Sequence, residues 1–141
     1  MIEMIRRQQA AQATVARFKG QPHQFGKNDC VRMAAFVMRR MGHRPQLGKA
    51  GAYSSLKGAM AALKKAGFPD LGTALDSLGL QRIPPAAALP ADIVMIPAVA
   101  FDGQLTIAVG NGRVLGWHED IDTAEILQPV DFIGAWRNSV N

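Results

Sequence analysis

The residues with the clearest chemical potential are Asp29 and Cys30, which follow a turn-rich stretch and open an apolar run. Cys30 is the single cysteine of the chain, so no internal disulfide can form and its thiol is either structural or reactive. A cysteine in the first turn of a helix lies near the positive end of the helix dipole, which favours the thiolate and lowers the thiol pKa. This position suits a nucleophile. The competing interpretation is a small core residue, because cysteine is among the most buried residue types.

The apolar spacing after Asp29 predicts the helix that would position this thiol. Asn28 or Asp29 is suited to the N-cap and Gly42 to the residue just beyond the C-terminus. Residues at helical spacing would form the buried face of this helix, namely Cys30, Ala34, Val37 and Met41. His43 follows the far end of the helix, about 20 Å from Cys30 at the helical rise, so it cannot act on the thiol.

The rest of the chain is predicted to place helices first and strands second. Helices are expected over residues 2–18, from Ser54 or Ser55 to Gly67, and over 71–78. Their apolar faces are expected to include Ile2, Ile5, Val15, Phe18, Leu56, Met60 and Leu63. Strands are expected over residues 93–96, 104–109, 113–118 and 132–137, with Gly110-Asn111-Gly112 as a hairpin turn. This order predicts a single α+β domain over residues 1–141, with N-terminal helices packed on a C-terminal antiparallel sheet.

Charge is distributed unevenly along the 141 residues, whose net charge is +5. Residues 1–65 hold 13 Lys/Arg and 2 Asp/Glu (+11), whereas residues 66–141 hold 3 Lys/Arg and 9 Asp/Glu (−6). Two interpretations are open: a basic binding surface, or a basic helical half packed on an acidic sheet half. Nucleic acid is not the expected partner, because no recognition motif or aromatic interleaving accompanies the basic residues.

Other classes of site lack a pattern in the sequence. No stretch approaches the roughly 18 apolar residues of a membrane helix, and no apolar signal segment follows Arg6-Arg7. The three histidines show no metal-ligand spacing, and no phosphate loop or cofactor motif is found. We therefore expect no membrane span, no metal and no cofactor.

The segment Phe25-Gly26-Lys27-Asn28-Asp29-Cys30, followed by a helix and then an antiparallel sheet with a Gly-Asn-Gly hairpin, resembles the NlpC-type papain-like cell-wall peptidases. The closer resemblance is to a divergent branch of that fold found in bacteriophage tails and gene-transfer particles. It rests on the Asp-Cys pair and on Tyr53 to Gly67, Asp70-Leu71 and Ala135-Trp136-Arg137. The resemblance implies a papain-like architecture with Cys30 at the nucleophile position.

One departure from the family pattern bears directly on catalysis. Family peptidases carry His-Val-x-Ile-x-x-Gly at the strand before the hairpin, where this chain has Gln104 to Gly110. Gln104 thus occupies the position of the catalytic histidine, and glutamine cannot accept the proton of the thiol. Two other histidines are candidate bases, His118 on the return strand and His23 in the preceding loop.

The hairpin register decides whether His118 shares a face with Gln104. A two-residue turn at Asn111-Gly112 pairs residue 104 with 119 and sends His118 to the opposite face. A three-residue loop at residues 110–112 pairs 104 with 118, so that the two side chains share a face. The sequence leaves both registers open.

Two functions follow from the resemblance. The first is a structural tail-tip or baseplate-associated protein of a phage or phage-like particle, with a peptidase-like fold that has lost activity. Its partners would be other tail-tip or hub proteins, and it would be made in the host bacterial cytoplasm and located in the virion tail. The alternative is a cysteine endopeptidase that cleaves peptidoglycan stem peptides during genome entry, with Cys30 as nucleophile and His118 or His23 as base.

Overall fold

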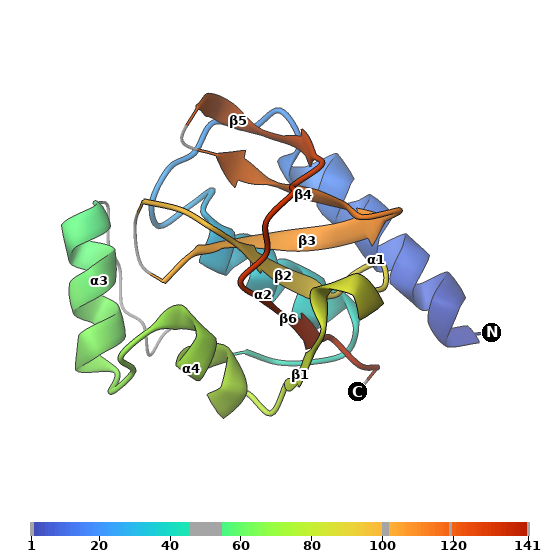
Figure 1. The fold of residues 1–141 in the computed structure, drawn as a ribbon, viewed down its shortest axis with the longest axis horizontal. Helices are drawn as coiled ribbons and strands as arrows, with labels where there is room; N and C mark the ends of the chain where they lie inside the picture. Colours follow the sequence, from blue (N-terminus) through green and yellow to red (C-terminus); the bar gives the residue numbers. More distant parts are fainter. Residues whose placement is uncertain (1, 46–54, 100–101, 119, 141) are drawn as a thin grey trace.

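The computed structural model describes residues 2–45, 55–99, 102–118 and 120–140. In these segments four α-helices are followed by a sheet of six strands (Figure 1). The helices are α1 (Ile2–Phe18), α2 (Cys30–Arg40), α3 (Leu56–Lys65) and α4 (Leu71–Ser77). The strands are β1 (Gln81–Ile83), β2 (Ile93–Ile96), β3 (Gln104–Gly110), β4 (Arg113–His118), β5 (Ile121–Leu127) and β6 (Gly134–Arg137), and a short 3-10 helix, η2 (Pro85–Ala87), follows β1.

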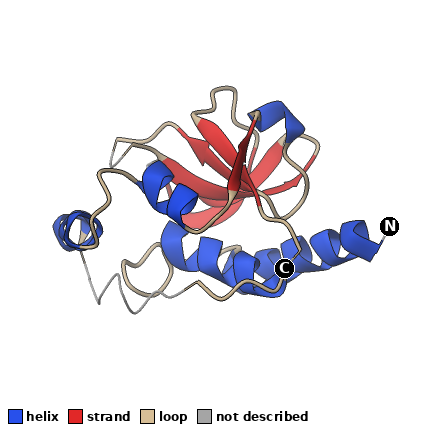
Figure 2. Cartoon of the chain, turned by 90° about the horizontal axis from the view of Figure 1, so that it is seen from below, coloured by secondary structure: helices blue, strands red, loops and turns tan. Residues whose placement is uncertain are grey.

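The sheet has the order β1-β6-β2-β3-β4-β5, and every neighbouring pair is antiparallel. Helices α1 and α2 lie on one face of it, as the view from below shows (Figure 2). The predicted α+β class, with N-terminal helices on a C-terminal antiparallel sheet, is therefore confirmed. None of the helices in the described segments is long and apolar enough to cross a membrane.

The main hydrophobic core fills the space between the sheet and helices α1 and α2. It includes Phe18 of α1, Met33 and Val37 of α2, and Leu105 and Ile107 of β3. A second, smaller cluster lies on the other face of the sheet, and its members are Val94, Ile96, Ala108, Val114 and Ala135. Because side chains alternate along a strand, β3 contributes Leu105 and Ile107 to the helix-covered face and Thr106 and Ala108 to the other.

Helix α1 does not bury the face that its isoleucines suggest. Ile2 and Ile5 are 84% and 54% exposed, whereas Arg7, Ala10, Ala11, Thr14 and Phe18 are buried. The Arg7 guanidinium donates a hydrogen bond to Asp92 Oδ1 at 2.8 Å, and both side chains are fully buried. The buried face of α1 thus includes this ion pair, Ile2 and Ile5 face outward, and their predicted place on the buried face is wrong.

Three further expectations are corrected. Met60 of α3 is 48% exposed, so it does not lie on a buried face. The last strand begins at Gly134, and Phe132 and Ile133 precede it as exposed residues. Strands β1 and β5 were not predicted, and they form the two edges of the sheet. Tyr53 and Ser54 lie outside the described residues, and Ser55 caps α3 by accepting a hydrogen bond from the Gly58 amide.

The hairpin between β3 and β4 combines features of both open registers. Asn111 and Gly112 form the turn with φ of 56° and 74°, the left-handed conformation that a tight hairpin turn requires. Gly110 pairs with Arg113, but an irregularity between Ala108 and Gly110 shifts the register, so that Ala108 pairs with Val114 and Ile107 with Leu115. Continued along the strands, this register sets Gln104 opposite His118, as the three-residue loop predicted, although the turn itself has two residues.

Gly103, which leads into β3, is required by close packing. A Cβ at this position would lie 2.5 Å from Met95 Cγ and 2.9 Å from the carbonyl oxygen of Ile96. The methionine side chain can move, but the backbone oxygen cannot, so Gly103→Ala should lower the free energy of unfolding by about 1–3 kcal/mol. Gly134→Ala is the control in urea denaturation, because its Cβ would meet Trp136 at an ordinary 3.5 Å. Equal stability of the two variants would refute the assigned packing.

Candidate active site

Asp29 fixes the start of the cysteine's helix, as the sequence predicts. Its Oδ1 accepts a hydrogen bond from the Arg32 amide at 2.9 Å, and its Oδ2 accepts one from the Gly26 amide at 2.7 Å. The Arg32 guanidinium also lies 3.2 Å from Oδ2. The buried carboxylate thereby holds the loop before α2 against the first turn of the helix, and Cys30 is the first residue of that helix.

Cys30 lies against the first residues of strand β3. Its half-buried side chain packs on the main core cluster, and the Leu105 amide, one residue after Gln104, is near enough to lower the pKa of the thiol. In Figure 1 the start of α2 lies behind the start of β3. The structure therefore brings together, at the level of the backbone, the two segments that the sequence identified as nucleophile and base positions.

Burial raises the pKa of the Cys30 thiol to about 12. The Asp29 carboxylate adds to this increase, whereas the backbone amides of Leu105, Cys30 and Val31 lower the pKa by donating to the sulfur. The helix start thus has the thiolate-favouring effect expected of it, but desolvation outweighs that effect. The expectation that the position lowers the thiol pKa is wrong in its net sign, and the thiol is protonated at neutral pH.

Gln104 does not take part in a hydrogen-bonded site with Cys30. It pairs across the sheet with Ile96, a member of the cluster on the face away from α2. Its Nε2 is buried and has no hydrogen-bond partner among the described residues. Strand alternation places the side chain on the Ile96 face, opposite to Leu105.

His118 also lies on the face away from α2. Its neighbour Trp117 points into the main core, where its ring meets Phe18 edge to face at 6.1 Å. His118 therefore points the other way. Its Nδ1 accepts a hydrogen bond from the Asp120 amide at 3.2 Å and lies 3.5 Å from the Asp120 carboxylate. His118 shares a face with Gln104, but that is not the face on which Cys30 packs.

His23 lies on the helix side of the sheet, in contact with aromatic rings. Its imidazole meets the rings of Phe25 and Trp117 edge to face, with centroid distances of 4.6 and 5.5 Å. Burial lowers the pKa of His23, and the nearby Asp29 carboxylate partly reverses this effect. The lowered pKa favours the neutral form of the imidazole. Among the described residues, no histidine forms a hydrogen bond or an ion pair with Cys30.

A buried polar network on the same side of the fold was not foreseen from the sequence. Asp92 Oδ1 accepts from Arg7 Nη1 and from the Asn138 amide, both at 2.8 Å, and Oδ2 accepts from the Leu89 amide at 2.9 Å. Arg137 Nε lies 3.0 Å from Oδ2. Arg7 and Asp92 are 85 residues apart, so no local pattern indicates their contact. The network joins α1, the start of β2 and the end of β6.

The raised thiol pKa predicts how stability depends on pH. A protonated thiol stabilises the fold fully below the unfolded-state pKa of about 8.5, and this contribution is lost as the pH rises toward the folded-state value of about 12. Wild type should therefore lose stability relative to Cys30→Ala above about pH 8.5, by at most about 1.4 kcal/mol per pH unit. Urea denaturation of both proteins at several alkaline pH values measures this difference. Parallel pH profiles would show that the thiol is not desolvated.

No group of three or more His, Cys, Asp or Glu side chains in the described part of the chain could hold a metal ion. No curated protein and no solved structure matches the sequence. A family model described as a domain of unknown function, DUF6950, matches residues 4–138, which include Cys30, the whole sheet and the Asp92 network. The chain therefore belongs to the DUF6950 family.

Proposed function

We propose that this chain is an NlpC-type, papain-like domain that has lost catalysis and serves as a structural protein at the tail tip or baseplate of a phage or phage-like particle. The observation that carries the loss of catalysis is the state of Cys30. Its thiol has a pKa raised to about 12, and no described histidine forms a hydrogen bond or an ion pair with it. A cysteine peptidase requires the opposite, a thiol that a neighbouring imidazole deprotonates.

Two observations support the papain-like assignment. The cysteine opens a helix that packs on a central strand of an antiparallel sheet, and the sulfur contacts the backbone beside the predicted histidine position. The assignment to a particle rests on the resemblance at Asp70-Leu71 and Ala135-Trp136-Arg137. These segments adjoin in the fold, because Asp70 caps α4 and the Trp136 indole donates to Asp76 of the same helix at 2.9 Å.

The resembling residues thus perform structural tasks that do not need an active thiol. Asp70 Oδ1 accepts from the Thr73 amide at 2.7 Å, and Asp76 also pairs with Arg82 at 2.9 Å. We infer that other tail-tip or hub proteins bind this scaffold.

Peptidoglycan hydrolysis by the full chain tests the loss of catalysis. Wild type, Cys30→Ala and Gln104→His are each incubated with purified sacculi, and released peptides are measured. We expect no release by any of the three, because residue 104 lies on the Ile96 face and the raised pKa of the Cys30 thiol keeps it protonated in each protein that retains it. Release by wild type that Cys30→Ala abolishes would overturn the proposal in favour of an endopeptidase.

The structural role has a separate test. Phage or phage-like particles that carry the gene for this chain are purified from their host bacterium. The proteins of these particles are identified by mass spectrometry. We expect the chain in assembled tails at a fixed ratio to the other tail proteins. Its absence from intact particles would contradict the assignment to the tail, whatever the outcome of the hydrolysis experiment.

A further inference from the structure

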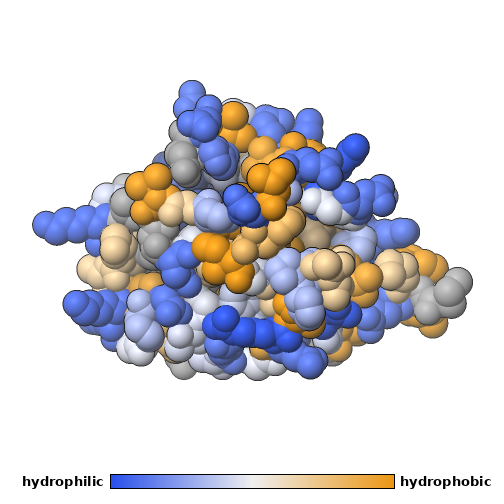
Figure 3. Space-filling model, in the orientation of Figure 1, coloured by the Kyte–Doolittle hydropathy of each residue, from blue (hydrophilic) through white to orange (hydrophobic). Residues whose placement is uncertain are grey.

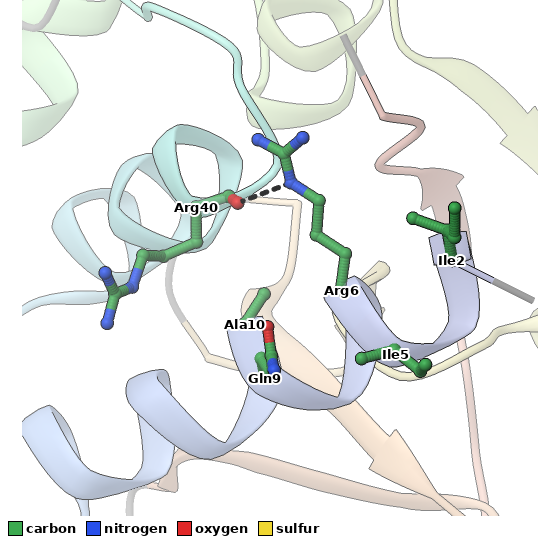
Figure 4. A pocket seen from close by; sticks show the side chains of 6 residues that line it. All are labelled: Ile2, Ile5, Arg6, Gln9, Ala10 and Arg40. Atoms are coloured by element: carbon green, nitrogen blue, oxygen red, sulfur yellow. Dashed lines mark hydrogen bonds between the residues drawn. The ribbon is translucent and has the colours of Figure 1, made fainter.

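The exposed isoleucines of α1 border an open groove between the N-terminal half of α1 and the end of α2. The groove has a volume of about 530 Å³ and is lined by Ile2, Ile5, Arg6, Gln9, Ala10 and Arg40, and we call it the basic groove. In Figure 4 the Arg6 side chain crosses from α1 toward α2, where its Nε donates to the Arg40 carbonyl at 3.3 Å. The Arg40 guanidinium lies over the Phe36 ring, 5.6 Å from its centroid, and points away from Arg6. The groove therefore combines apolar side chains with one guanidinium group, that of Arg6.

The basic groove lacks an acidic counterpart within its own chain. Among the described residues, no carboxylate pairs with Arg6 or Arg40. Of the ion pairs in those residues, two join the basic first part of the chain to the acidic second part, Arg7–Asp92 and Lys19–Glu125. The ion pairs between the basic first part and the acidic second part of the described chain therefore leave Arg6 and Arg40 without an acidic partner.

A surface of complementary character lies elsewhere on the same chain. The connection from β5 to β6 must pass β4, β3 and β2, and it does so on the face opposite to α1 and α2 (Figure 1). Within it, Val130, Asp131, Phe132 and Ile133 are all exposed, and we call these four residues the acidic strip. Apolar side chains reach the surface near the middle of this face (Figure 3). No described residue forms an ion pair with Asp131.

We propose that the basic groove of one copy binds the acidic strip of a second copy. Ile2 and Ile5 would cover the apolar side chains of the strip, and Arg6 would meet Asp131. The argument is complementarity: each surface holds exposed apolar residues, and each holds unpaired charge of the sign that the other lacks. The inference does not depend on the proposed function, because it uses these two surfaces alone.

The placement of the two surfaces determines the kind of assembly. They occupy different faces of the molecule, so the contact is heterologous and runs head to tail. Such contacts close into a ring or continue as a filament, and they do not stop at a two-fold dimer. The surfaces are small, so we expect weak association that rises with protein concentration and falls as salt increases.

A charge-reversal experiment on the full chain tests the contact. Arg6→Glu gives a copy whose groove and strip are both acidic, and Asp131→Arg gives a copy whose groove and strip are both basic. Each variant alone should raise the dissociation constant of self-association about tenfold or more. An equimolar mixture should associate again, because each variant's groove then meets a strip of opposite charge. Sedimentation equilibrium at low salt measures all three samples.

Two further variants complete the design. Lys64→Glu on α3 makes the same charge change as Arg6→Glu at an exposed site outside both surfaces and should leave association unchanged. Ile5→Ser should weaken association without a change in charge. A wild-type chain that stays monomeric at about 1 mM would overturn the proposal. So would variants that associate as wild type does, or a mixture that fails to recover, and binding to a different protein would then become the explanation of the groove.

Discussion

Replacing Asp92 by alanine should lower the free energy of unfolding by about 3–5 kcal/mol. The substitution leaves the Arg7 guanidinium fully buried without its carboxylate. It also removes the acceptor for the amides of Leu89 and Asn138. Since domains of this size are stable by roughly 5–15 kcal/mol, such a loss would leave the variant near its unfolding threshold at ambient temperature.

The second partner of Arg7 provides the control. Glu3 lies 3.1 Å from Arg7 Nε, but its side chain is 54% exposed, so Glu3→Ala should cost less than about 1 kcal/mol. Urea denaturation of the two variants compares a buried and an exposed partner of the same arginine. If Asp92→Ala were no less stable than Glu3→Ala, the buried network would not hold α1 to the sheet.

A double-mutant cycle separates the ion pair from the other bonds of Asp92. Arg7→Met alone leaves the carboxylate with two amide donors and Arg137 close by, so it should cost less than Asp92→Ala. The double variant should be more stable than the sum of the single losses predicts, because it leaves no buried guanidinium without its partner. Simple additivity would show that the two side chains do not interact.

The sequence predicted those features of the fold that depend mainly on residues close together in the chain. Asp29 caps α2 because a carboxylate at that position can reach the amide three residues later, whatever the rest of the chain does. Asn111-Gly112 forms the hairpin turn because both residues tolerate positive φ. The central strands β2, β3 and β4 were predicted because they are buried on both faces and are correspondingly apolar.

The two edge strands of the sheet, β1 and β5, were not predicted because they are less buried than the central strands. Strands β1 and β5 each have a single neighbouring strand and contain exposed residues, so their sequences lack a run of buried side chains. In β5, Asp122 and Glu125 interrupt the apolar alternation that identifies a strand. Edge strands depend on pairing with a neighbour, and this pairing leaves little trace in their own composition.

The face of α1 and the state of Cys30 depend on contacts between distant segments. The isoleucines of α1 are the stronger local hydrophobic signal, but the buried side of the helix is the one on which Arg7 pairs with Asp92, 85 residues away. For Cys30, the helix start does favour the thiolate. Burial in the folded protein reverses the net effect, and this burial depends on the packing of α2 against the sheet, which the residues around the cysteine do not reveal.

The alkylation rate of Cys30 by iodoacetamide at pH 7 is the most direct test of the claim that this thiol is not a nucleophile. The thiolate is the reactive form, and each unit of pKa changes its population about tenfold. With a pKa of about 12, native Cys30 should react roughly 10³-fold more slowly than the same cysteine in the urea-unfolded chain. Alkylation of the native protein as fast as the unfolded control, or faster, would mean an activated thiolate and would contradict the account.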